Sequence, residues 1–160
     1  MTSVPTVRRA DPEDAAALVD LRAAMIESVN GTSVSDNGWR QTCEQMLCDK
    51  LMADSQEWAA YVVDGADGVP VSCVVGWVLE HLPGPRNITS HRGYVASMST
   101  APEARGKGYG RAVFAALMAW FDAVGIDEVS LLASDMGAPL YAEFGFTVSG
   151  PKAMVWLRRR

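Results

Sequence analysis

The stretch Arg105-Gly106-Lys107-Gly108-Tyr109-Gly110-Arg111 follows an extended segment at residues 93–100 and opens a segment with helical periodicity. The apolar side chains that give this periodicity are Val113, Phe114, Leu117, Met118 and Phe121. Glycines let main-chain amides approach an anion closely, and the positive end of a helix dipole points at the same place. Arg105, Lys107 and Arg111 add side-chain cations to an acidic protein. The stretch therefore predicts a loop that binds a diphosphate.

Two other kinds of phosphate loop do not fit these residues. The dinucleotide pattern GxGxxG requires a third glycine where Arg111 stands, and the P-loop requires Ser or Thr where Gly108 stands. The sequence also has no acidic residue after a second strand–helix unit, as a dinucleotide oxidoreductase would need. A glycine-rich turn with no function remains the alternative interpretation.

Two helices and four strands are predicted before this loop. A short strand at residues 6–9 precedes Asp11 and Pro12, which favour a helix start, and that helix should end near Gly31. A second helix at residues 39–52 would place one side of its surface in the core: Trp39, Cys43, Met46, Leu47 and Leu51. The runs at 58–63 and 71–79 predict an antiparallel hairpin, and 93–100 predicts the next strand.

The elements after the loop complete one domain, residues 1–160. The loop's helix should end at Gly125, followed by a strand at 129–133, a short helix at 137–144 and a hairpin of 146–148 with 152–157. This order, βααβββαβαββ, predicts an α/β fold (α+β by some schemes) with helices on both faces of a mixed sheet.

Composition excludes several functional classes. The 160 residues include 19 acidic and 14 basic side chains, and the net charge of −5 disfavours nucleic acid and weakly favours a cationic partner. The three cysteines show no CxxC spacing, so we expect reduced thiols and no metal. The N-terminus has no apolar stretch of the signal-peptide kind, and no run of apolar residues could span a membrane. We therefore expect a cytoplasmic protein.

Two segments resemble the signatures of one family. Residues 93–110 resemble the strand, the Arg/Gln-x-x-Gly-x-Gly loop and the helix start of the GNAT superfamily of acyl-CoA N-acyltransferases. Residues 138–146, with Tyr141, Gly145 and Phe146, resemble its second signature. The resemblance implies a mostly antiparallel sheet of six or seven strands, about four helices, and acetyl-CoA as co-substrate. Residues 1–92 match only in the order of their elements.

The resemblance also implies roles for individual residues. In the family the strand before the loop separates from the next one, and the pantetheine arm of coenzyme A enters the gap. The resemblance thus places coenzyme A against the end of that strand and against the loop: Met98, Ser99, Thr100, Arg105, Gly106, Lys107, Gly108, Tyr109, Gly110 and Arg111. Tyr141 would contact the co-substrate and protonate the departing thiolate, with simple core packing as the alternative.

Other roles stay open in the sequence. Asp135 stands where many relatives carry Asn, so it could contact pantetheine or cap the helix from residue 137. Glu80 is the first candidate for the general base, ahead of His81 and His91. We expect an N-acetyltransferase that acts on a small amine or a protein amino group; the rival hypothesis is a non-catalytic acyl-CoA-binding module, which would not need Tyr141. The sequence names no acceptor, and a homodimer is possible.

Overall fold

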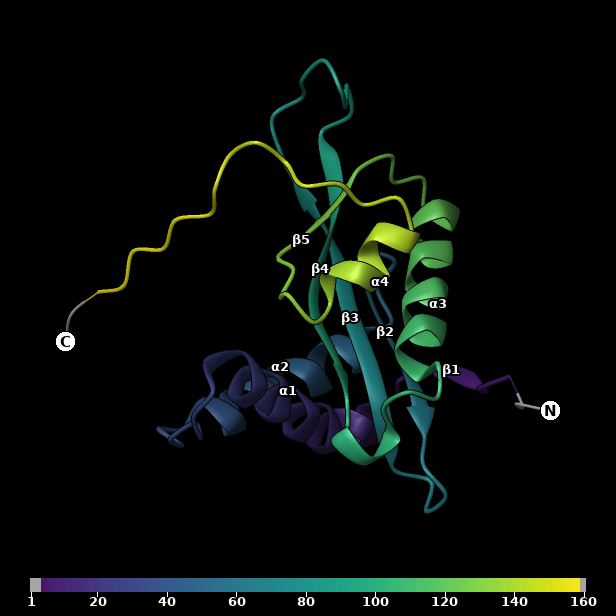
Figure 1. The fold of residues 1–160 in the computed structure, drawn as a ribbon. Helices are drawn as coiled ribbons and strands as arrows, with labels where there is room; N and C mark the ends of the chain where they lie inside the picture. The colour runs from purple at the N-terminus through teal and green to yellow at the C-terminus, as the bar shows by residue number, and fades with distance from the viewer. Residues whose placement is uncertain (1–3, 159–160) are drawn as a thin grey trace.

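The computed structural model describes residues 4–158 (Figure 1). Its helices and strands follow the predicted order as far as the short helix after the fifth strand. They are β1 (Val7–Arg9), α1 (Ala15–Asn30), α2 (Trp39–Ala53), β2 (Trp58–Asp64), β3 (Pro70–Glu80), β4 (His91–Thr100), α3 (Tyr109–Ala123), β5 (Val129–Leu131) and α4 (Ala138–Glu143). Two 3₁₀ turns, Pro12–Asp14 and Pro102–Ala104, precede α1 and follow β4. Within this part of the chain no helix is long and apolar enough to cross a bilayer.

The five strands form one mixed sheet in the order β1-β2-β3-β4-β5. Neighbouring strands are antiparallel except β4 and β5, which are parallel. α1 and α2 pack on one face around Leu18, Leu47 and Val62, whereas α3 packs on the other face through Phe114 and Phe121. The prediction of a mixed sheet with helices on both faces is confirmed.

Two glycines let α3 lie close to the sheet. A Cβ built on Gly93 of β4 would stand 2.5 Å from the ring of Phe121, and one on Gly76 of β3 would stand 2.9 Å from Leu117. Real Cβ atoms do not approach other atoms this closely, so any side chain here would displace the helix. The depth of α3, and of the loop at its N-terminus, is therefore set by these glycines.

A β-bulge in β4 changes which face of the sheet the odd-numbered side chains occupy. Val75 pairs with Ser97 and Gly76 pairs with Val95, so Ala96 is an extra residue opposite β3. Before the bulge, Val95 packs in the α3 core; after it, Ser97 lies opposite Val75, which belongs to the α1/α2 core. The side chains of Met98 and Thr100 consequently point toward α3, where both lie close to Gly110.

β5 covers only the first half of β4. The pairing runs from Gly93 with Val129 to Val95 with Leu131 and stops there. Beyond that point, residues 96–100 of β4 have no strand on this side within residues 4–158. The predicted strand 129–133 is thus shorter than expected, and the outer edge of β4 is open.

The predicted C-terminal hairpin is wrong for the described residues. Residues 146–158 contain no strand, so the sheet has five strands instead of six or seven, and the segment leaves the body of the protein (Figure 1). Met154, Val155, Trp156 and Leu157 are four consecutive apolar side chains, each at least 77% exposed. Without polar residues between them they offer no single face to bury, which is what fixes a strand in register.

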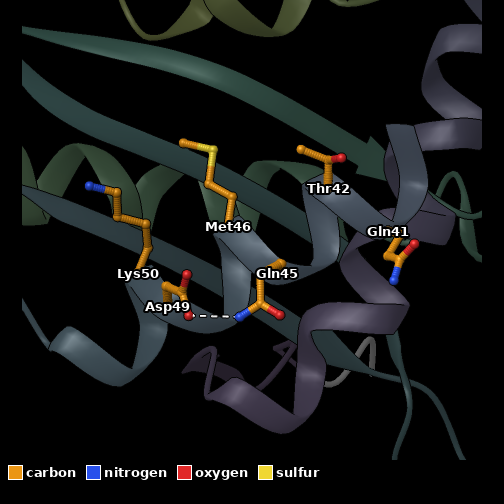
Figure 2. A pocket seen from close by; sticks show the side chains of 6 residues that line it. All are labelled: Gln41, Thr42, Gln45, Met46, Asp49 and Lys50. Atoms are coloured by element: carbon orange, nitrogen blue, oxygen red, sulfur yellow. Dashed lines mark hydrogen bonds between the residues drawn. The ribbon is translucent and has the colours of Figure 1, made fainter. Parts of the chain in front are cut away.

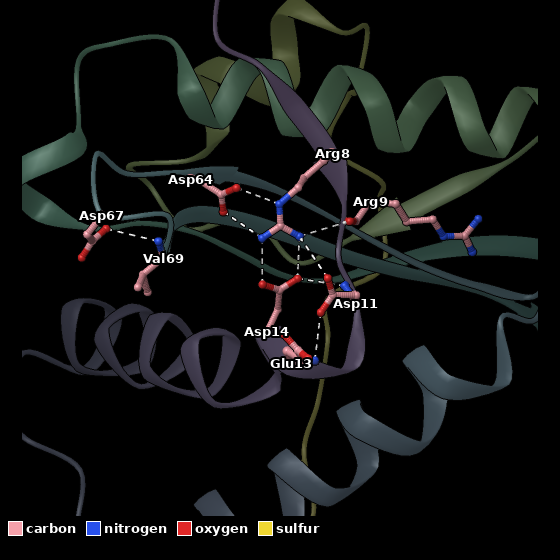
Figure 3. A network of polar contacts seen from close by, with 8 residues as sticks. All are labelled: Arg8, Arg9, Asp11, Glu13, Asp14, Asp64, Asp67 and Val69. Carbon is pink, nitrogen blue, oxygen red and sulfur yellow. Dashed lines mark hydrogen bonds and ion pairs between the residues drawn. The ribbon is translucent and has the colours of Figure 1, made fainter.

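A carboxylate–guanidinium cluster joins the start of the chain to the sheet (Figure 3). The guanidinium of Arg8 donates two hydrogen bonds to Asp14, at 2.7 and 2.8 Å, and two to Asp64, at 2.7 and 2.8 Å. Asp14 also accepts a bond from the amide of Asp11. Burial alone would raise the pKa of Asp14, but these hydrogen bonds and the charge of Arg8 lower it, while both carboxylates raise the pKa of Arg8.

We predict that Gly93→Ala lowers the free energy of unfolding by about 1–3 kcal/mol, because its methyl group would overlap the ring of Phe121. Urea denaturation followed by tryptophan fluorescence measures this. Gly84→Ala is the matched control, since a Cβ there meets no atom within 4 Å. Equal stability of the two variants would contradict the close approach of α3.

We predict that Asp14→Asn lowers the free energy of unfolding at pH 7 by roughly 2–4 kcal/mol, because a neutral amide leaves the Arg8 charge half-compensated. The folded pKa of Asp14 lies below its ordinary value of 3.8. Its stabilisation is therefore present above about pH 4 and lost as the pH falls through the folded pKa.

The measurement is thermal unfolding of wild type, Asp14→Asn and the exposed control Glu13→Gln between pH 2 and pH 7. The gap between wild type and Asp14→Asn should narrow at the acid end. A gap that is constant across this range would rule out the ionised cluster as its source.

Candidate active site

The glycine-rich loop turns the chain sharply between β4 and α3. Gly106 and Gly108 have φ values of +75° and +79°, a region that residues with a Cβ rarely adopt. Arg105 donates a hydrogen bond from Nε to the carbonyl oxygen of Thr100, at 3.1 Å. No side chain caps α3, whose N-cap is Gly108, so its first amides point outward without helical partners. These amides and Lys107 form a concentrated positive site on an acidic protein.

The open edge of β4 presents two main-chain positions. Gly93 donates its amide hydrogen to Glu128, so before the bulge the odd-numbered residues face β5. Ala101 donates to Val71 on β3, so after the bulge the odd-numbered residues face β3 instead. The amide and carbonyl groups of Met98 and Thr100 therefore face the open edge, whereas those of Ser99 are directed to β3. The bulge at Ala96 is what exchanges these roles.

Tyr141 of α4 reaches this edge of the sheet. Its ring is buried against Phe114, with centroids 5.2 Å apart, and its hydroxyl group donates to the sulfur of Met98 at 3.5 Å. Burial raises the pKa of Tyr141, so its hydroxyl proton is retained throughout the neutral range. The residue thus packs in the core and also directs a proton donor at β4. Packing and proton donation are both compatible with this position.

The cations of the loop do not all have the same surroundings. Arg111 forms an ion pair with Glu143 at the end of α4, and both side chains are about half exposed. Its charge is therefore partly compensated within the protein. Lys107 is exposed and forms no ion pair within residues 4–158. Arg105 is also exposed and forms no ion pair there. We conclude that Lys107, Arg105 and the main-chain amides hold the larger share of free positive charge.

Asp135 does not cap α4. The amide of Gly137 donates to the hydroxyl oxygen of Ser134 at 3.2 Å and to its carbonyl oxygen at 3.1 Å. Asp135 itself is exposed in the connection between β5 and α4. The N-cap residue of α4 is Gly137, and no side chain caps the helix, so the capping alternative for Asp135 is wrong; contact with a ligand stays a prediction.

The candidate bases lie at the far end of β4. Glu80 is exposed and pairs with His91, six strand positions from the pair of Val74 with Met98, a separation of roughly 20 Å. His81 is hydrogen-bonded through Nε2 to buried Asn87, whose amide group also donates to the carbonyl oxygen of His91. The two histidines thus help to order the β3–β4 connection, and the structure does not bring Glu80 next to Tyr141.

The three thiols are unsuited to nucleophilic chemistry. Burial raises the pKa of Cys73 to about 12, and burial also raises that of Cys43 despite the charge of Arg22. Cys48 packs against the α1/α2 core. A thiol that stays protonated is a poor nucleophile.

A shallow hollow of about 530 Å³ lies over the surface of α2 (Figure 2). Its lining residues are Gln41, Thr42, Gln45, Met46, Asp49 and Lys50. Met46, predicted to be in the core, is 51% exposed, whereas Leu47, predicted on the same face, is buried. No residue predicted for the active site lines this hollow.

The family assignment agrees with this geometry. The profile described as "Acetyltransferase (GNAT) family" matches residues 25–146. The chain therefore belongs to the GNAT acetyltransferase family. Among curated proteins, no sequence matches.

Solved structures share the whole fold at low sequence identity. A GCN5-related N-acetyltransferase from Ralstonia eutropha superposes with a TM-score of 0.83 at 23% identity, over 96% of this chain and 99% of that one. A predicted acetyltransferase from Clostridium acetobutylicum, crystallised with acetyl-CoA, gives 0.81 at 20% identity, over 95% and 96%. Glucosamine-6-phosphate N-acetyltransferase from Arabidopsis thaliana gives 0.75 at 14% identity, over 98% and 100%.

Sequence reasoning missed three features of the site. The bulge at Ala96 has no signal, because alanine is ordinary in a strand. The ion pair of Arg111 with Glu143 joins two helices whose packing the sequence does not specify. The hydrogen bond from Gly137 to Ser134 could have been found, since serine hydroxyl groups often accept a main-chain hydrogen bond in a turn.

Proposed function

We propose that the chain is an N-acetyltransferase that moves the acetyl group of acetyl-CoA directly to a primary amine of a small molecule or protein, in a ternary complex. One observation carries this proposal. At the open edge of β4, the main-chain amide and carbonyl groups of Met98 and Thr100 point away from β3. They lie between the Arg105–Arg111 loop and the hydroxyl group of Tyr141. A binding loop, an unpaired strand edge and a proton donor thus meet at one place.

The open edge of β4 suits the amide-containing pantetheine arm. A ligand with alternating N–H and C=O groups can pair with a free strand edge as another strand would. Met98 and Thr100 would form these bonds, and Ser99 would keep β4 on β3. The diphosphate would lie against the amides of Gly106, Gly108, Tyr109 and Gly110, with Lys107, Arg105 and Arg111 nearby. Asp135 would approach the arm from the β5–α4 connection.

Each catalytic role then follows from a group at this edge. The amide of Met98 would donate to the carbonyl oxygen of the thioester and stabilise the negative charge that develops when the amine attacks. As the carbon–sulfur bond breaks, Tyr141 would pass its proton to the thiolate. The attacking amine must lose a proton as well. Glu80, the first candidate from the sequence, lies roughly 20 Å along the strand, too far to take this proton directly or through one water molecule. Water at the open edge of β4 would therefore accept it.

Two fold neighbours support the proposal. The Clostridium structure was crystallised with acetyl-CoA, and the Arabidopsis protein is named for acetyl transfer to an amino sugar phosphate. The rival hypothesis, a non-catalytic acyl-CoA-binding module, would need the loop but not the hydroxyl group of Tyr141. The hydroxyl group of Tyr141 lies beside Met98 at the open edge of β4, where a departing thiolate would need a proton, and this position supports the enzyme.

We predict that Tyr141→Phe lowers kcat about 100-fold and changes KM for acetyl-CoA little, because the ring keeps its packing on Phe114 while the proton donor is lost. Release of free thiol from acetyl-CoA across an amine panel measures this. Since the pKa of Tyr141 is raised from 10.0, its proton should not limit the rate below about pH 10.

Tyr61→Phe, in a half-buried tyrosine of β2, is the matched control and should keep full activity. Binding of acetyl-CoA without thiol release from any amine would sink the enzyme and favour the binding module. Full activity of Tyr141→Phe would remove Tyr141 from the mechanism.

We predict that Gly108→Ala weakens the affinity for coenzyme A at least tenfold. Gly108 is the N-cap of α3, where the proposed diphosphate would lie, and a Cβ added there would stand in open space, where a ligand would meet it. Gly125→Ala is the matched control, because Gly125 has nearly the same φ, +78°, at the other end of α3. Both variants should lose about 1–2 kcal/mol of stability, but only Gly108→Ala should lose affinity by calorimetric titration. Equal affinities would place the diphosphate elsewhere.

A further inference from the structure

Within residues 4–158, four buried side-chain atoms have no hydrogen-bond partner in the protein: Trp39 Nε1, Trp58 Nε1, Arg92 Nε and Ser97 Oγ. Three of these atoms can only donate, and the fourth is a hydroxyl group that can donate or accept. A buried donor without a partner costs about 1–3 kcal/mol. Native domains hold only a few such atoms, and each needs an explanation, which a ligand that brings hydrogen-bond acceptors would supply.

All four atoms belong to residues on the same face of the sheet, the α1/α2 face. Trp39 and Trp58 pack in the α1/α2 core. Ser97, only 6% exposed, lies opposite Val75 of that core. Arg92 stands two residues before Tyr94 on the same side of β4, because side chains alternate along a strand. The ring of Tyr94 contacts that of Trp77, which packs against the same core.

Arg92 provides a positive charge on this face. Its side chain is partly buried and forms no ion pair among the described residues. Its Nε atom is buried without a partner. The rings of Trp77 and Tyr94, with centroids 5.5 Å apart, lie between it and Ser97 along the sheet. A guanidinium beside an aromatic surface suits an anionic group on a short apolar chain.

We propose that the amine acceptor carries an anionic group, a carboxylate or a phosphate-like group, that binds Arg92 while its chain lies on Trp77 and Tyr94. The amine then lies beside Ser97, next to the open edge at Met98. This assignment rests on the proposed function, since it takes the thioester to lie at Met98. It concerns the face of the sheet opposite to α3 and assigns a role to residues that the coenzyme does not use.

The spacing along β4 sets the length of the acceptor. Arg92 pairs with Leu79 and Ser97 with Val75, so four strand positions, roughly 13 Å, separate them. If the flexible Arg92 side chain leans along the strand and covers about half of this distance, the anion stands on the order of 7 Å from the amine. An α-amino acid, whose two charged groups are adjacent, is too short. A chain of about five or six carbon atoms fits.

The first experiment compares acceptors of matched length by thiol release from acetyl-CoA. The probes are 6-aminohexanoate, (5-aminopentyl)phosphonate, hexylamine and glycine. Either anionic long-chain amine should exceed hexylamine at least tenfold in kcat/KM, and glycine should be poor. The carboxylate and the phosphonate together show which anion is preferred. A hexylamine rate equal to or above both anionic amines overturns the proposal, and so does a preference for glycine.

Arg92→Met should reduce the preference for the anionic amines over hexylamine to less than threefold, without changing KM for acetyl-CoA. Arg92→Lys should retain part of it, because the charge remains. Arg86→Met removes an exposed arginine from the β3–β4 connection and should keep the full preference. Thermal unfolding checks that each variant is folded. An unchanged preference in folded Arg92→Met overturns the proposal.

A binding measurement separates this proposal from the proposed function. Hexanoate and pentylphosphonate, which have no amine, are titrated into wild type and Arg92→Met in the presence of coenzyme A, with tryptophan fluorescence as the readout. Saturable binding that weakens at least tenfold in Arg92→Met supports the anion site even if no amine is acetylated, in which case only the proposed function fails. If neither anion binds saturably to wild type, the anion site is excluded, whatever the activity.

Discussion

The parting of β4 from β5 is the constraint on which the rest of the site depends. β5 pairs with only three residues of β4, and the bulge at Ala96 then reverses the direction in which the strand presents its groups. Without the extra residue, Met98 and Thr100 would direct their amides into β3. With it, the main-chain groups of Met98 and Thr100 face the open edge. The side chain of Met98 contacts Tyr141 on one face of the sheet, and the side chain of Ser97 lies on the opposite face.

The two faces of the sheet have different roles in the proposed site. On the α3 face, Gly76 and Gly93 fix the depth of α3, so that the loop at its N-terminus meets the end of β4. On the α1/α2 face, Ser97 and Arg92 remain without hydrogen-bond partners among the described residues at the named atoms. The proposed co-substrate and acceptor would thus approach the same point of β4 from different directions, as direct transfer requires.

Much of this was predictable from the sequence, and the reasons are local. Gly106 and Gly108 predict the loop, and the spacing of Phe114 and Phe121 predicts the helix after it. The separate roles of Tyr141 and Met98 came only from the family resemblance, and their direct contact was not predicted, because no short-range pattern joins residues so far apart. The prediction of a C-terminal hairpin was wrong because strand propensity alone does not specify which strand a segment pairs with. The sequence placed both Met46 and Leu47 on the core face, and the exposure of Met46 depends on how α2 packs.

The opposite edge of the sheet is closed in a different way. β1 is three residues long and carries Arg8, which is held by Asp14 and Asp64, so that edge is short and charged. The edge of β4 beyond β5 differs, because its main-chain groups are unpaired and another polypeptide could add a strand to it. A bound thioester would occupy this edge and shield it. A protein saturated with co-substrate should therefore associate with itself less than the free protein does. Its solubility would then depend on the concentration of the co-substrate.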